Sequence, residues 1–210
     1  MSTVMDTLPP ARSKRRSGIA TAAISACIFA IACMVSLTAA SRPAAAADPA
    51  VKFMAQVGRE LMAAARTRSP GTMASVIQKY GDVSYIGLYS LGSYRTQLST
   101  ADRATYYGGM VKFISRYAAT EAPKFPVATV EWADESVRGA SGVMVDSKVT
   151  MEDGGVYEIR WLLAKYGDSY KVRDAMVVGF WMTPFLKQLF EDYIAQNGGN
   201  PSALVAALNR

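Results

Sequence analysis

The side chains that could do chemistry in this chain are carboxylates, hydroxyls and amines, because the sequence contains no His and only two Cys. Acidic residues are paired at Asp134-Glu135, Glu152-Asp153 and Glu191-Asp192. Two carboxylates in one site can act as general acid and general base. Each pair falls in a predicted turn, at a strand end or on a polar helix face, where solvated charges are expected. Without His, a Ser-His-Asp triad and a His-ligated metal site are excluded.

Glycines give no sign of a phosphate-binding loop, since no Gly-rich segment joins a predicted strand to a helix. Gly108-Gly109 lies inside a predicted helix, where each glycine costs about 1 kcal/mol relative to alanine. We therefore expect another segment to pack unusually close to that backbone. We predict no catalytic site, no cofactor and no metal.

The first 47 residues resemble a secretory signal peptide. Basic residues precede an uncharged apolar segment from Gly18 to Ala40, and small residues follow at Ala45 and Ala47. We predict cleavage after Ala47, which leaves residues 48–210 as one domain without Cys, as suits an oxidising compartment. The alternative is a permanent anchor, because the 23 uncharged residues could span a hydrocarbon core of roughly 30 Å.

The positive charge of the chain belongs mainly to this leader. The whole chain has 23 basic and 17 acidic residues, a net charge of +6. Residues 1–47 hold 5 of the basic and 1 of the acidic residues, so 18 and 16 remain, a net charge of +2. Such a small excess does not favour nucleic acid as a partner.

Apolar spacing and capping residues predict helices first, then strands, then helices. The expected helices cover residues 51–65, 72–80, 83–98 and 99–119, then a helix from Thr183-Pro184 to Gln196 and a last one from Asn200-Pro201. Two-residue alternation and β-formers predict strands over residues 127–135, 142–151, 156–165 and 170–182. The fold class is therefore α+β, a curled antiparallel sheet of about four strands covered on one face by several helices.

The apolar load of the chain is high, with 11 Tyr, 7 Phe, 3 Trp and 11 Met. These side chains could simply fill a core. A sheet curled beneath helices can equally enclose a hydrophobic pocket, and Met suits cavities that accept flexible ligands. Sequence patterning leaves both possibilities open.

The second half of the chain resembles the MlaC family, the toluene-tolerance family of periplasmic phospholipid-binding proteins. The resemblance rests on Trp161, the turn before Tyr170-Lys171-Val172, Asp174, Gly179 and a closing helix that ends at Gly198-Gly199. Upstream, Leu91-Gly92-Ser93-Tyr94, residues 99–103, Tyr106-Tyr107, Phe113 and Tyr117 look like the helical half of the family. Val178 and Phe180-Trp181 depart from the family pattern.

The resemblance implies a periplasmic carrier, in a Gram-negative bacterium, that holds phospholipid acyl chains in a hydrophobic pocket. Its partners would be an inner-membrane lipid ABC transporter complex and an outer-membrane lipoprotein complex, and its role would be outer-membrane lipid asymmetry. It would not be an enzyme, and a shuttle of this kind is most simply a monomer. From facing, size and the family layout we expect these lipid-binding residues: Ile86, Leu91, Tyr94, Met110, Phe113, Ile114, Val145, Val149, Ile159, Trp161, Val172, Met176, Phe180 and Leu186.

Three other hypotheses remain at this stage. The cargo could be another hydrophobic ligand such as a hopanoid, whose rigid rings would need a broader slot. The chain could be an α+β enzyme, which predicts an acid deep in the cavity with a raised pKa, and Asp174 is the candidate. It could also be a non-catalytic envelope adaptor, which a filled core would favour.

Overall fold

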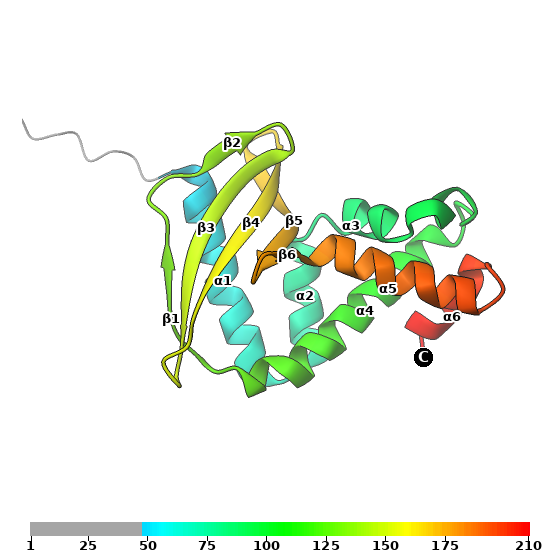
Figure 1. Ribbon diagram of the computed structural model, residues 1–210, viewed down its shortest axis with the longest axis horizontal. Helices are drawn as coiled ribbons and strands as arrows, with labels where there is room; N and C mark the ends of the chain where they lie inside the picture. The colour runs from blue at the N-terminus through cyan, green and yellow to red at the C-terminus, as the bar shows by residue number, and fades with distance from the viewer. Residues whose placement is uncertain (1–47) are drawn as a thin grey trace, which may run out of the picture. The chain divides into compact units, whose positions relative to one another are not determined.

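The computed structural model describes residues 48–210. The predicted signal peptide, including both Cys, lies outside the described residues. The helices are α1 (Pro49–Thr67), α2 (Pro70–Tyr80), α3 (Val83–Ser90), α4 (Arg103–Glu121), α5 (Met182–Gln196) and α6 (Pro201–Leu208), with short 3-10 helices η1 (Gly92–Thr96) and η2 (Ala122–Lys124). The strands are β1 (Val127–Trp132), β2 (Val137–Gly139), β3 (Gly142–Met151), β4 (Val156–Tyr166), β5 (Ser169–Val177) and β6 (Phe180–Trp181). The α+β class is confirmed (Figure 1).

Side-chain caps and proline at the first helical position start three of the helices. The Asp48 carboxylate accepts hydrogen bonds from the backbone N–H groups of Ala50 and Val51 at the start of α1. The second helix begins at Pro70, two residues earlier than expected, because the Ser69 hydroxyl accepts a hydrogen bond from the Thr72 N–H and caps the helix. Asn200 caps α6 as predicted.

The predicted helix over residues 83–98 is shorter, because α3 ends at Ser90 and η1 follows. Gly92 has a φ of 52° in the left-handed region, which interrupts the helix. A Cβ at this position would collide with the carboxylate of Glu191. That carboxylate accepts from the backbone N–H and the hydroxyl of Ser93, so it ties η1 to α5.

The close neighbour expected at Gly108-Gly109 is found at the second glycine. A Cβ on Gly109 would lie 2.8 Å from the Leu208 Cβ of α6 and 2.6 Å from the amide nitrogen of Asn209. Gly108 has open space at the same position. Helix α6 therefore packs against the backbone of α4.

The sheet is antiparallel, with the strand order β1-β3-β4-β5-β6 and β2 paired with β3. It has six strands rather than about four. The predicted strand over residues 127–135 ends at Trp132, and β2 adds to β3 after a turn. The predicted strand over residues 170–182 reverses at Val178-Gly179, both with positive φ, and returns as β6.

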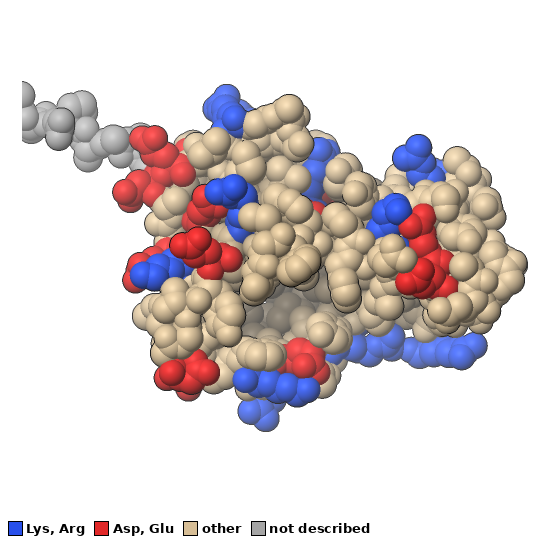
Figure 2. Space-filling view, viewed as in Figure 1, with Lys and Arg blue, Asp and Glu red and all other residues tan. Residues whose placement is uncertain are grey.

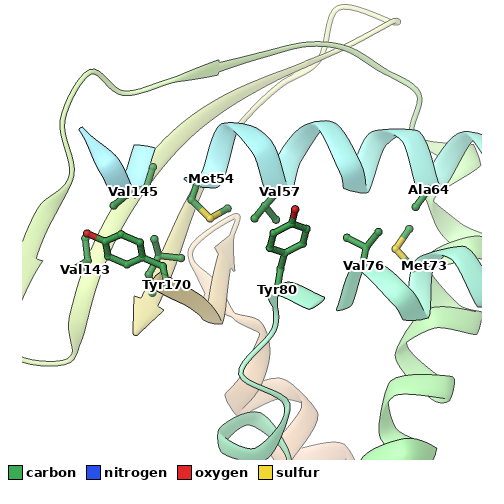
Figure 3. Close-up of a cluster of buried hydrophobic side chains, with 11 residues drawn as sticks. Met54, Val57, Ala64, Met73, Val76, Tyr80, Val143, Val145 and Tyr170 are labelled. Carbon is green, nitrogen blue, oxygen red and sulfur yellow. The ribbon is translucent and has the colours of Figure 1, made fainter. Parts of the chain in front are cut away.

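Buried apolar residues form two separate clusters. One joins α1 and α2 to the concave face of the sheet and includes Met54, Val57, Tyr80, Val145 and Tyr170 (Figure 3). The other joins α3, η1, α4, α5 and α6. Within residues 48–210, none of the helices combines the length and apolarity needed to cross a membrane.

Candidate functional site

An apolar cavity of about 690 Å³ opens to the surface of the molecule (Figure 2). Its walls come from α1, α2, α3, α4, the sheet and α5. The lining residues are Val57, Leu61, Met73, Val76, Ile77, Tyr80, Gly81, Ile86, Phe113, Ile114, Tyr117, Ala118, Trp161, Val172, Arg173, Asp174, Ala175, Met182, Thr183, Phe185, Leu186 and Leu189. Its size is within the usual range of ligand pockets.

The sheet presents one face to this cavity. Trp161 of β4 pairs with Ala175 of β5 and with Val145 of β3, so the three side chains share a face. The indole N–H of Trp161 donates to the Ser147 hydroxyl, 3.0 Å away, which satisfies its polar atom. The ring is therefore held in place as an apolar wall.

Helices α4 and α5 form the opposite wall and are joined at one end of it. The ring of Phe190 in α5 packs edge-on against Phe113 and Tyr106 of α4, at centroid distances of 5.9 and 6.3 Å. Towards the start of α5, Met182, Phe185, Leu186 and Leu189 line the cavity. The first half of α5 and the facing part of α4 therefore border the cavity, whereas the second half of α5 packs against α4.

Charge is confined to two neighbouring lining residues, Arg173 and Asp174. Arg173 is the extra residue of a bulge in β5, and its Nε donates to Asp82 at 2.9 Å. Burial raises the pKa of Asp82, but hydrogen bonds from Tyr166 and Arg173 outweigh it and hold this pKa below its ordinary value. The guanidinium also lies over the Tyr85 ring, 4.3 Å from its centroid. Arg173 is thus already paired.

Asp174 is the acid that the enzyme hypothesis singled out. Burial raises its pKa, while hydrogen bonds from the backbone N–H groups of Thr183 and Ala175 oppose the shift. These bonds give it a structural role, because it caps the first turn of α5 from a neighbouring strand. That tertiary cap is why α5 begins at Met182 rather than with Thr183 as its N-cap. The hydroxyl of Thr183 donates instead to the Arg173 carbonyl.

Tyr80 and Tyr117 also line the cavity, and Tyr117 is largely exposed. The Tyr80 hydroxyl donates to Glu60 and is therefore occupied. Among residues 48–210, no group of three or more acidic, Cys or His side chains is placed to hold a metal ion. The cavity is suited to enclosing apolar chains.

The structure brings six of the predicted lipid-binding residues together at the cavity wall. They are Ile86, Phe113, Ile114, Trp161, Val172 and Leu186. The other eight lie elsewhere. Leu91, Tyr94 and Met110 pack in the second cluster, and Val145 packs between the sheet and α1. Val149 is buried and Ile159 half-buried farther along their strands, Met176 is on the opposite face, and Phe180 is exposed on β6.

Sequence reasoning missed most of the wall that α1 and α2 supply. Val57 and Leu61 are on the apolar face predicted for the first helix, but periodicity does not say whether a buried face meets a core or a cavity. Met73, Val76 and Ile77 of α2 were missed for the same reason. Tyr117 was recognised on the fourth helix, and its ring lines the mouth.

The family comparison agrees with this arrangement. The family model of the MlaC protein matches residues 54–210, which include every lining residue of the cavity. The chain belongs to the MlaC family. The resemblance noted from the sequence is therefore confirmed, and it covers nearly the whole described part of the chain.

A solved structure with the same fold is a phospholipid-binding protein from Ralstonia solanacearum, determined in complex with a phospholipid. It is 20% identical in sequence, with a TM-score of 0.63, and the match covers 78% of this MlaC-family chain and 96% of the other. At this identity the match shows a common fold. No curated protein matches the sequence.

Proposed function

We propose that this protein is a carrier that binds the acyl chains of a phospholipid in the cavity between the sheet, α4 and α5. The observation that carries the proposal is the cavity of about 690 Å³ with almost wholly apolar walls and an open mouth. Membership of the MlaC family and the phospholipid-bound neighbour of the same fold support it. The open cavity does not favour the adaptor hypothesis, which a filled core would favour.

The energetics of lipid transfer explain why such a cavity is useful. Exposing a chain of roughly 15 methylenes to water costs on the order of 12 kcal/mol, at about 0.8 kcal/mol per methylene, and two chains cost about twice as much. A carrier must therefore offer an environment nearly as apolar as the bilayer. The low charge of the lining meets this requirement, because Arg173 is neutralised by Asp82.

We also propose that residues 1–47 are a cleaved signal peptide and that residues 48–210 work in the periplasm as one lipid-binding domain. Cleavage after Ala47 would make Asp48 the first residue. Asp48 caps α1, and its other carboxylate oxygen accepts from the backbone N–H and hydroxyl of Ser136. The mature chain would thus begin at a residue that caps α1 and ties it to Ser136. Intact mass of the exported protein tests the cleavage site.

The partners proposed are those of the family: an inner-membrane lipid ABC transporter complex and an outer-membrane lipoprotein complex. A monomer that shuttles between them would maintain the lipid asymmetry of the outer membrane. The chain itself would be neither an enzyme nor a nucleic-acid-binding protein. Asp174 supports the non-catalytic proposal, since its carboxylate is used to cap α5.

A transfer assay tests the carrier function. Donor vesicles contain phospholipid with a self-quenched fluorescent chain, and the purified protein is added in the absence of acceptor vesicles. We expect dequenching that saturates at a fixed ratio of lipid to protein. A competing hopanoid that abolishes phospholipid uptake at lower concentration would favour the rigid cargo. No dequenching at any protein concentration would contradict a lipid carrier.

A further inference from the structure

The mouth of the cavity is surrounded by exposed apolar side chains. Tyr117 of α4 and Met182, Phe185 and Leu189 of α5 line the cavity and are also 65%, 39%, 67% and 42% exposed. Phe180, two residues before Met182, is 72% exposed. We call these five residues the rim. Figure 2 shows the hollow bordered mostly by uncharged residues.

The hairpin beside the rim keeps an apolar residue at its tip in spite of backbone strain. Val178 and Gly179 form the two-residue connection between β5 and β6, with φ values of 51° and 81°. Asn-Gly is the preferred pair for such a turn, and a β-branched residue in the left-handed region is an outlier. Val178 is 65% exposed, so packing within the domain does not explain it. Strain of this kind points to a function at the tip.

We propose that the rim and the hairpin tip form a docking surface that inserts into the surface of a lipid bilayer. The inference rests on the proposed function, because the cargo is itself a bilayer component. A chain that moves from the bilayer into the cavity through an inserted rim is never exposed to water. Phe and Leu side chains of peripheral proteins are buried at the boundary between headgroups and acyl chains, and Tyr is enriched at the membrane interface.

The size of the rim favours a bilayer over a stable protein partner. The three aromatic side chains of the rim are about two-thirds exposed and together present roughly 300–500 Å², at about 150–250 Å² for each whole side chain, and Met182 and Leu189 add to this area. A stable protein interface takes about 800 Å² from each partner. Patches of a few hundred Å² on monomers are often functional.

Charge contributes little to this surface. Arg116 directly precedes Tyr117 in α4, but neighbouring residues of a helix do not face the same way. The Arg116 guanidinium donates to the carbonyl oxygens of Leu208 and Arg210, so it points towards the end of α6 rather than towards the rim. We therefore expect reversible binding that rests on apolar insertion and depends little on salt.

Co-sedimentation with vesicles tests the inference. The full chain is expressed in a Gram-negative host, recovered from the periplasm and mixed with vesicles of phosphatidylcholine alone or of equimolar phosphatidylcholine and phosphatidylglycerol. We expect binding to both kinds of vesicle, with little weakening by added salt. The double variant Phe180→Ser/Phe185→Ser should bind about tenfold more weakly or worse, given the apolar area lost. Val137→Ser, which removes a 57% exposed apolar residue from β2, is the matched control and should bind normally.

Two further measurements separate a lost docking surface from a folding defect and from a failure of the carrier function. Val178→Asn should bind vesicles more weakly while its melting temperature rises, which a folding defect would not produce. Lipid content by mass spectrometry reports the carrier function independently. A protein that carries phospholipid but binds no vesicles, or a rim variant that binds like the wild type, would overturn the docking surface and leave the carrier intact. Vesicle binding by a protein that never contains lipid would instead support the surface and contradict the carrier.

Discussion

Filling the cavity from the sheet should block lipid binding without unfolding the protein. Ala175 of β5 is half-buried, lines the cavity and shares its face with Trp161. Ala175→Phe therefore directs a ring into a space of about 690 Å³ rather than into a packed core. Ala128 is exposed in β1, so Ala128→Phe is the matched control in the same sheet.

The expected loss of lipid affinity follows from the length of acyl chain that the ring introduced by Ala175→Phe would displace from the cavity. The new ring occupies the space of about six methylenes, each contributing about 0.8 kcal/mol when buried, which gives about 5 kcal/mol. Partial relaxation of the walls reduces this, as core substitutions show. With about 1.4 kcal/mol for each tenfold change, we expect lipid affinity to fall about a thousandfold.

The assay combines lipid content, vesicle uptake and thermal unfolding. Ala175→Phe should be recovered folded, with little or no lipid, and should take up labelled phospholipid only at far higher vesicle concentrations. Ala128→Phe should load like the wild type. If Ala175→Phe contains as much lipid as the wild type, the acyl chains do not occupy this cavity and the reasoning is refuted.

The other predictions concern stability, measured by urea unfolding. Asp82→Asn should cost about 3 kcal/mol at neutral pH, because it leaves the Arg173 guanidinium without its carboxylate. The pKa of Asp82 is lowered on folding, so its ionised carboxylate stabilises the folded state fully above the ordinary pKa of 3.8. This stabilisation is lost as the pH falls below 3.8. The difference in free energy of unfolding between the wild type and Asp82→Asn should therefore become smaller in acid. Gly109→Ala should destabilise by about 1–3 kcal/mol through contact with Leu208, whereas Gly108→Ala should be neutral or stabilising by up to about 1 kcal/mol. Val178→Asn should stabilise by about 1 kcal/mol and raise the melting temperature by about 2–4 °C.

Much of the fold could be predicted because its signals are local. The apolar spacing of α1 and α4, the Asn200-Pro201 start of α6 and the alternation in β3 and β4 each depend on neighbouring residues only. The errors arose where distant residues decide the structure. Gly92 has a positive φ just after α3 and leaves room for the Glu191 carboxylate, and α5 starts early because Asp174 caps it from β5.

The site was predictable only in part, for a related physical reason. Ile86, Phe113 and Trp161 were expected at the wall and line it, whereas Leu91 and Met110 are equally apolar and pack in the core. Hydrophobicity and periodicity predict that a helix face is buried. Whether that face packs in a core or lines a cavity depends on how far apart the helices lie, which the sequence pattern does not give. The reversal between β5 and β6 was missed because a turn at Val178 contradicts the usual preferences of its residue type, so residues 170–182 were predicted as one strand.

The most direct test of the carrier is the mass of the protein as it leaves the periplasm. The full chain is expressed in a Gram-negative bacterium, purified without detergent and measured in native and denaturing conditions, with the released ligand identified after extraction. We predict a mature chain that begins at Asp48 and carries a stoichiometric mass shift that resolves into phospholipid. A bare protein that also takes no labelled phospholipid from vesicles would contradict the central claim.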